Sequence, residues 1–200
     1  MILRILLAGV LGGAVMFGWG AAAHMVFQFD STMKTIPNED TVLSALRDQL
    51  NEGGIYFFPG ADMTREMTKE EQDAYVAKFR KGPSGLLIYT PSNERDPMAP
   101  EQLGIQLGIT IILCLLSAML LAQAAPALPS YVMRLFFMLL IGLIAGIAVP
   151  IPYWNWYGFP SDFTMMALAE QAIGFVLAGI LIAAIVRHKP KAAPPASAPA

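Results

Sequence analysis

Charge is distributed so unevenly along this chain that few architectures accommodate it. Segment 30–101 holds thirteen acidic and eight basic residues, a net charge of −5, and long apolar stretches lie on both sides of it. The chain ends and the start of the third apolar stretch carry basic residues without acidic ones: Arg4, Arg134, Arg187, Lys189 and Lys191. Because cytoplasmic segments of membrane proteins are enriched in Lys and Arg, this division predicts a membrane protein with cytoplasmic N- and C-termini.

Four apolar stretches support this prediction, and each is long enough to cross about 30 Å of hydrocarbon as a helix. They cover residues 5–27, 103–124, 132–149 and 163–186. Apolar residues make up 56% of the chain and charged residues only 14%, which argues against an ordinary soluble domain. The expected fold class is membrane all-α, a four-transmembrane-helix bundle in a bacterial cytoplasmic (inner) membrane. Arg134 is compatible with the third helix, because a long cation near a helix end snorkels to the interface.

The threading divides the chain into four regions. They are transmembrane helix 1 (1–29), an extracytoplasmic mini-domain (30–101), transmembrane helices 2–4 with an external loop over 150–162 (102–187), and a disordered, Pro/Ala-rich cytoplasmic tail (188–200). A cleaved signal peptide is the competing interpretation of the first stretch, because Ala21-Ala22-Ala23 resembles a cleavage site. We favour a retained helix, because the apolar run continues through Phe27.

Two helices are expected inside the mini-domain. Asn38 is a suitable N-cap for a helix over 39–51, whose apolar residues recur at helical spacing. Thr68 with Glu71 three residues later forms a capping box and predicts a second helix over 69–80.

Two short strands are expected beside these helices, over 55–58 and 86–89. Because a helix separates them, they are predicted to pair in parallel through a right-handed crossover, which makes the mini-domain a small α/β unit. A segment of this size with two short strands has a marginal core. We therefore expect it to depend on the membrane helices or on a partner for stability.

Signatures of familiar enzymes are missing from the sequence. It contains no phosphate-binding loop, no nucleophile elbow, no zinc-protease motif and no dinucleotide-binding fingerprint. Cys114 is the only cysteine, so no disulfide or CxxC pair exists, and a packing role is expected for it. We expect no cofactor, no metal site and no nucleic-acid partner.

Polar residues inside the apolar stretches are the sharpest functional signal. His24, Gln106, Glu170 and Gln171 are predicted to lie in one outer layer of the bilayer. A carboxylate in hydrocarbon is costly unless it is paired or neutral, and His24 is the ionisable residue placed to meet Glu170. The pair is interpreted as structural glue between the first and fourth helices or as a proton-handling or ligand-binding site. The remaining alternative is that Glu170 stays protonated and faces a neighbouring helix.

An aromatic string follows the third apolar stretch. Its members Tyr153, Trp154, Trp156 and Tyr157 are predicted at the outer interface, where amphipathic aromatic residues gather. An interfacial belt explains their types, whereas their concentration in one loop also fits contact with a partner or lipid.

Small residues recur four apart in every apolar stretch: Gly9 and Gly13, Gly104 and Gly108, Gly142 and Gly146, Gly174 and Ala178. This spacing allows helix backbones to approach closely, so we expect tight packing within the chain. A seam between copies in a homo-oligomer is the alternative.

These observations leave the biochemical role open among three classes. The leading hypothesis is a non-enzymatic accessory or assembly component that presents its mini-domain and aromatic loop to a membrane-protein partner. The first alternative is a small transporter or proton-coupled component that uses His24 and Glu170. The second is a membrane enzyme with its site at the outer interface. A cavity that reaches Glu170 would favour transport, and a closed pair would favour a scaffold.

Overall fold

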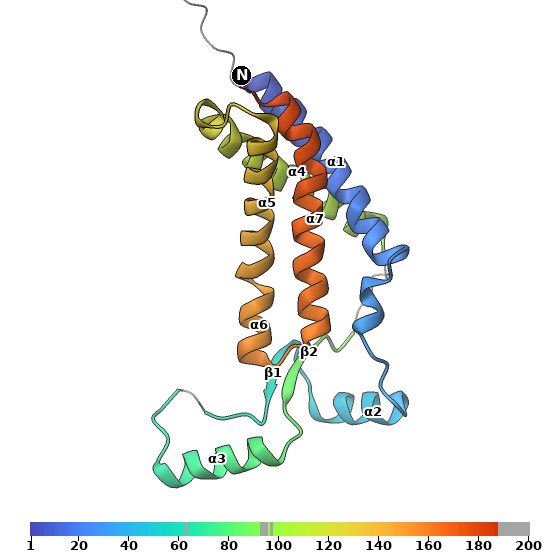
Figure 1. The fold of residues 1–200 in the computed structure, drawn as a ribbon. Helices are drawn as coiled ribbons and strands as arrows, with labels where there is room; N and C mark the ends of the chain where they lie inside the picture. Colours follow the sequence, from blue (N-terminus) through green and yellow to red (C-terminus); the bar gives the residue numbers. More distant parts are fainter. Residues whose placement is uncertain (63, 93–95, 97, 188–200) are drawn as a thin grey trace, which may run out of the picture.

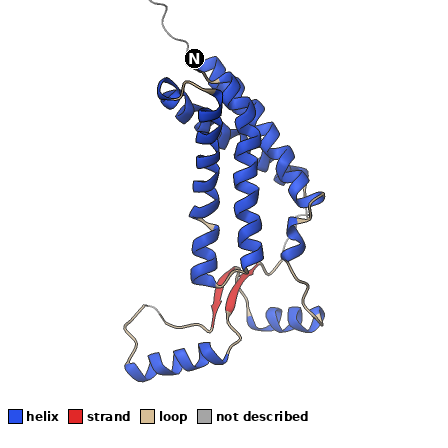
Figure 2. Cartoon of the chain, viewed as in Figure 1, coloured by secondary structure: helices blue, strands red, loops and turns tan. Residues whose placement is uncertain are grey.

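Four long helices dominate the computed structural model, which describes residues 1–62, 64–92, 96 and 98–187 (Figures 1 and 2). They are α1 (Ile2–Met25), α4 (Pro100–Ala124), α5 (Tyr131–Ala148) and α7 (Ser161–Ile185). Each is long and apolar enough to cross a membrane, and each begins and ends within a few residues of its predicted bounds. The predicted tail over 188–200, with Lys189 and Lys191, lies outside the described residues.

The long helices form a curved row in the order α4, α1, α7, α5. Helix α1 packs between α4 and α7, and α7 packs between α1 and α5, whereas α4 touches α5 and α7 over short stretches (Figure 1). A short helical turn, η2 (Ala125–Ala127), joins α4 to α5. The buried core includes Ala8, Leu121, Met138 and Ile182, one from each long helix. The helices are therefore tied together away from the mini-domain, and α1 diverges from α7 towards it (Figure 1).

Glycines make the close contacts in this row. A Cβ added at Gly13 of α1 would lie 2.5 Å from the Ile111 Cα of α4, and one added at Gly142 of α5 would lie 3.1 Å from the Ala172 Cα of α7. The expectation of tight packing within the chain is confirmed at these helix pairs. At Gly104 and Gly108 it is wrong, because added Cβ atoms there would meet no described atom within 4 Å.

The predicted external loop over 150–162 is mostly helical. Helix α6 (Pro150–Tyr157) continues directly from α5, and Gly158, with φ 72°, ends it. Pro150 and Pro152 occupy the first turn of α6, where no backbone N–H is needed for the helical ladder. Helix α5 ends at Ala148, close to the predicted end at 149, but the expected loop is wrong over 150–157, because the prolines start a new helix there.

The mini-domain contains the predicted helices and strands close to their expected bounds. Its elements are η1 (Phe29–Thr32), α2 (Glu39–Gln49), β1 (Gly54–Phe58), α3 (Lys69–Lys81) and β2 (Gly85–Tyr89). The capping box at the start of α3 is confirmed. Asn38 stands at the N-cap position of α2, but with φ 53° and without a capping hydrogen bond from its side chain.

The two strands pair antiparallel, so the prediction of parallel pairing was wrong. Ile55 lies opposite Ile88, and Phe57 lies opposite Leu86. A parallel pair requires its connecting helix to cross the face of the sheet. Helix α3 instead extends sideways from the sheet, so the chain returns along β1 in the opposite direction (Figure 1). The mini-domain is consequently an α+β unit rather than the expected α/β unit.

Apolar side chains of the mini-domain remain largely exposed. Helices α2 and α3 and both strands have no fully buried residue among those described. Ile55 and Ile88, which face each other across the sheet, are 72% and 73% exposed. Phe57 contacts Tyr157 of α6 edge-on, with ring centroids 6.5 Å apart, and this contact connects the sheet to the long helices. The described helices and strands of the mini-domain therefore bury even less apolar surface than the marginal core that we predicted.

Arg134 is buried rather than extended to an interface as expected. Its side chain is 7% exposed, and Nε donates to the Ala183 carbonyl oxygen in the last turn of α7. Nη1 donates to the carbonyl oxygens of Leu128 and Pro129. Carbonyls at a helix C-terminus lack partners and carry partial negative charge, so they solvate this cation without a carboxylate.

Candidate functional site

The candidate site begins where α1 ends. His24 lies in the last turn of α1, and the helix stops at Met25, two residues earlier than predicted. Gln28 then adopts a left-handed conformation with φ 53°, which reverses the chain into η1. This reversal brings Asp30, six residues after His24, back to the histidine ring.

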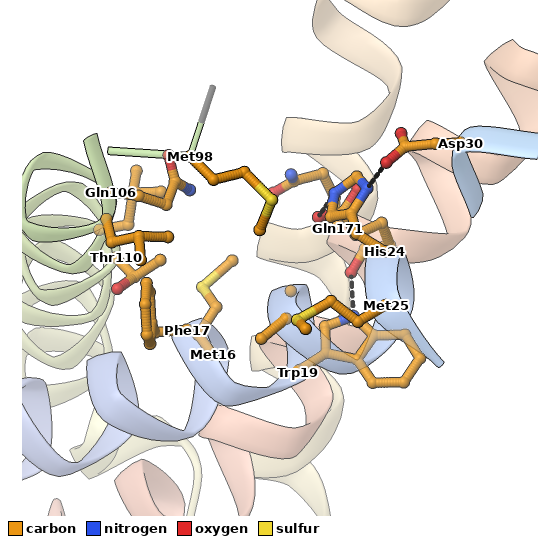
Figure 3. A pocket seen from close by; sticks show the side chains of 15 residues that line it. Met16, Phe17, Trp19, His24, Met25, Asp30, Met98, Gln106, Thr110 and Gln171 are labelled. Atoms are coloured by element: carbon orange, nitrogen blue, oxygen red, sulfur yellow. Dashed lines mark hydrogen bonds and ion pairs between the residues drawn. The ribbon is translucent and has the colours of Figure 1, made fainter. Parts of the chain in front are cut away.

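His24 contacts one carboxylate with each of its ring nitrogens. Nδ1 lies 3.0 Å from Asp30 Oδ2 (Figure 3), and Nε2 lies 3.4 Å from Glu170 Oε1 on α7. The side chains of His24, Asp30 and Glu170 are 44%, 54% and 24% exposed. The structure thus brings the two predicted residues to ion-pair distance and adds Asp30. We call these three residues the His24 cluster.

A hydrogen bond from Trp19 to its backbone carbonyl holds Glu170 in place. The indole Nε1 of Trp19 donates a 3.0 Å hydrogen bond to the Glu170 carbonyl oxygen, which fixes α7 against α1 at this level. Gly174, one helical turn further along the same face of α7, packs against Trp19 and Met16. Glu170 therefore faces α1 because the small-residue seam of α7 faces α1.

A pocket of about 410 Å³ opens beside the His24 cluster. It lies between α1, α4 and α7, and one face of α4 contributes Leu103, Gln106, Thr110 and Leu113. Figure 3 shows Met16, Met25 and Met98 around the same space. Its volume falls in the range of small-molecule sites, which are mostly apolar with a few convergent polar groups.

All four predicted cluster residues, His24, Gln106, Glu170 and Gln171, line this pocket. Sequence reasoning missed Asp30, Trp19 and the methionines. Asp30 is the first charged residue after the first apolar stretch, and this position was the available signal for it. Met98 and Trp19 carried no signal, because nothing in the sequence indicated that they face the same cavity.

The number of protons on the His24 cluster determines its hydrogen bonds and its net charge. A neutral imidazole carries one N–H, so it donates to one carboxylate, and a hydrogen bond to the second carboxylate would need another proton on the ring or on a carboxyl group. In either form the cluster has a net charge of −1. Loss of that proton leaves a charge of −2 and a ring nitrogen lone pair facing a carboxylate. This geometry is therefore compatible with one exchangeable proton in the cluster.

The same geometry does not favour a metal ion. Asp30 and Glu170 lie on opposite edges of the imidazole ring, so the three side chains do not converge on one point. Among the described residues, no group of three His, Cys, Asp or Glu side chains is arranged to hold a metal.

The aromatic residues predicted to contact a partner or lipid lie on α6, away from the His24 cluster. Trp156 is 75% exposed, and Trp154 Nε1 donates to Ser161 Oγ at 3.0 Å. Tyr153 packs on Phe159, and Tyr157 meets Phe57 of the mini-domain. Their binding role stays a prediction, although three of the four side chains, Tyr153, Trp154 and Tyr157, have structural contacts that explain their positions.

Comparison with known proteins assigns no family to this chain. No family model matches it, and neither a curated protein nor a solved structure is significantly similar to it.

Proposed function

We propose that this protein is a small proton-coupled component of a membrane, in which the His24 cluster takes up and releases one proton. The observation that carries the proposal is the contact of His24 with a carboxylate at each ring nitrogen, beside an open pocket. A purely structural pair has no need of a cavity or of a second carboxylate. The open pocket is the arrangement that favours transport over a closed scaffold.

The proposal includes an orientation. With Arg4, Arg134 and Arg187 on the cytoplasmic side, the pocket opens towards the outer side of a bacterial inner membrane. The acidic mini-domain then also lies outside, and its net negative charge attracts protons and other cations to that side of the membrane. Reporter fusions after Thr90 are expected to be external, and fusions after Arg187 are expected to be cytoplasmic. The reverse pattern would refute this orientation.

The proton site is tested on His24 itself. The chain has two histidines, so His188→Gln leaves His24 as a single reporter for ¹⁵N NMR in lipid nanodiscs. Glu170→Gln and Asp30→Asn are each expected to change the pH profile of the His24 ring nitrogens, because each removes one of the two carboxylates. Glu101→Gln, an exposed carboxylate outside the pocket, is the matched control. A profile that neither pocket substitution changes would contradict the proposal.

A second candidate function is the accessory or assembly role, which the exposed sheet of the mini-domain favours. Ile55 and Ile88 present an apolar pair on a segment whose described helices and strands have no fully buried residue. Exposed apolar patches mark interaction sites more often than ordinary surface does. A photo-crosslinker at Ile55 in native membranes is expected to give one discrete adduct that Ile88→Lys abolishes. A crosslinker at exposed Ser44 of α2 is the control, and an identical adduct from both positions would argue against the sheet as the contact.

A further inference from the structure

The pocket beside the His24 cluster has the profile of a site for an amphipathic ligand. Apolar side chains form most of its wall, including Met16, Phe17, Leu103 and Leu113. The charged groups gather at the His24 cluster, whereas Gln106 and Thr110 lie across the cavity on α4 and carry no charge (Figure 3). A ligand that fills this space therefore needs an apolar body and one polar or charged end.

The net charge of the pocket determines whether the polar end of the ligand is a cation or an anion. The titratable groups in the pocket are His24 from α1, Asp30 from η1 and Glu170 from α7, while α4 contributes the uncharged Gln106 and Thr110. No Lys or Arg appears among the described residues that line it. The cluster carries a charge of −1 with its proton and −2 without it. An anion is repelled in both states, whereas a cation replaces the missing proton.

The methionines add tolerance to ligand shape. Met16 and Met25 of α1 and Met98 from the segment before α4 surround the same cavity (Figure 3). Unbranched thioether side chains adapt to irregular shapes, and they are used at surfaces that accept several partners. The pocket is consequently suited to a class of apolar cations rather than to one rigid molecule.

We propose that this pocket binds a lipophilic organic cation in exchange for the proton of the His24 cluster. The inference rests on the proposed proton site and adds its ligand class. The exchange balances in charge and atoms: one monovalent cation enters, one proton leaves to water, and the site keeps a net charge of −1. No bond other than that to the exchanged proton is made or broken.

Tetraphenylphosphonium is the probe, and tetraphenylborate is its control of nearly equal shape and opposite charge. Binding is measured by isothermal titration calorimetry on the full chain in zwitterionic nanodiscs, with empty nanodiscs subtracted. Tetraphenylphosphonium is expected to saturate one site per chain and to release one proton, detected by comparing buffers of different ionisation enthalpy. Because proton and cation compete, its affinity should rise about tenfold per pH unit over the range in which the cluster loses its proton.

Two variants connect the binding to the cluster. Glu170→Gln and Asp30→Asn are each expected to weaken tetraphenylphosphonium binding about tenfold or more, because each removes one negative charge from the site. Asp30 is more than half exposed, so its substitution remains informative if Glu170→Gln fails to fold. Glu101→Gln should leave the affinity unchanged. Equal saturable binding of the two probes, or unchanged affinity in both variants, would overturn the cation assignment.

Different experimental outcomes would contradict the proposed proton site and the proposed ligand class. If His24 responds to the two carboxylate substitutions but tetraphenylphosphonium does not bind, the ligand class is wrong and the proton site stands. If the cation binds without proton release and without pH dependence, exchange is wrong and a simple cation pocket remains. A lipid ammonium headgroup has the same chemistry as a free cation. Competition by nanodiscs containing phosphatidylethanolamine identifies the lipid as the source, and its absence identifies a free cation.

Discussion

The indole Nε1 of Trp19 lies 3.0 Å from the carbonyl oxygen of Glu170, so a side chain of the first long helix holds the backbone of the last. The Trp19 ring also packs on Phe27 and Phe29, with ring centroids 5.8 and 6.2 Å away. One residue thus positions both Glu170 and the segment that carries Asp30. The geometry of the His24 cluster depends on this contact.

Replacing Trp19 with Phe tests that dependence. The phenyl ring keeps most of the packing and loses the N–H, so we expect the free energy of unfolding to fall by about 1 kcal/mol. We also expect the pH profile of the His24 ring nitrogens to change, because Glu170 is no longer held by α1. Denaturant titration in detergent and ¹⁵N NMR measure the two effects. Trp156→Phe, on the exposed surface of α6, is the control and should affect neither quantity.

Arg134 provides a second test, at the opposite end of the helices. Its guanidinium donates to three carbonyl oxygens, of Ala183, Leu128 and Pro129, in directions that one ammonium group does not reproduce. Arg134→Lys is expected to lower the free energy of unfolding by about 2 kcal/mol, since hydrogen bonds from a charged group are lost. Arg187→Lys, at an exposed position, should leave stability unchanged. Equal stability of the two variants would show that charge alone holds this end.

The glycine contacts predict a difference between two Gly→Ala substitutions. An alanine Cβ at Gly13 would lie 2.5 Å from the Ile111 Cα, so α1 and α4 must separate. Overpacking of this kind costs about 1–3 kcal/mol. Gly104→Ala meets no described atom within 4 Å and should be neutral or slightly stabilising. Thermal unfolding in detergent distinguishes the two, and a destabilising Gly104→Ala would indicate that this open face packs against another molecule.

Glu71 in the mini-domain gives a pH-dependent prediction. The bidentate Arg65 guanidinium and the Thr68 backbone N–H lower the pKa of the Glu71 carboxyl from 4.5 to about 2. Because the folded pKa lies below the unfolded one, this stabilisation is complete above about pH 4.5 and is lost as the pH falls through about 2. ¹³C NMR of the Glu71 carboxyl measures its titration. Arg65→Gln should return the pKa towards 4.5, and an unchanged value would assign the shift to another cause.

The long helices were predictable from sequence because each apolar stretch is too long for a β-strand and long enough for a membrane-spanning helix. The two strands and the capping box of α3 were predictable because each is indicated by residues close together in the sequence. The pairing direction of β1 and β2 was not, since it depends on where α3 lies in space rather than on its helicity. Pro150 and Pro152 misled the prediction of a loop, because a proline that ends one helix is equally compatible with the first turn of the next.

The candidate site was predictable in part. A shared depth brought His24 and Glu170 together in the prediction, and the cost of an unpaired charge in hydrocarbon gave the reason. Asp30 was assigned to the mini-domain by its charge. The left-handed turn at Gln28 returns it to His24, and a non-glycine residue gives little sequence signal for that conformation. The pocket itself lies between α1, α4 and α7, an arrangement of three helices that no local sequence pattern predicts.

The order of the row, α4, α1, α7, α5, has a consequence for biosynthesis. Helix α1 leaves the ribosome first, yet its neighbour α7 is made last among the four, and Gly12 of α1 packs against Ile182 near the end of α7. By contrast, α5 and α7 are joined by α6 and can associate as soon as they are synthesised. A nascent chain that stops before α7 leaves one side of α1 without its partner. Completion of this fold, and of the cluster around His24, therefore waits for the last helix to be inserted.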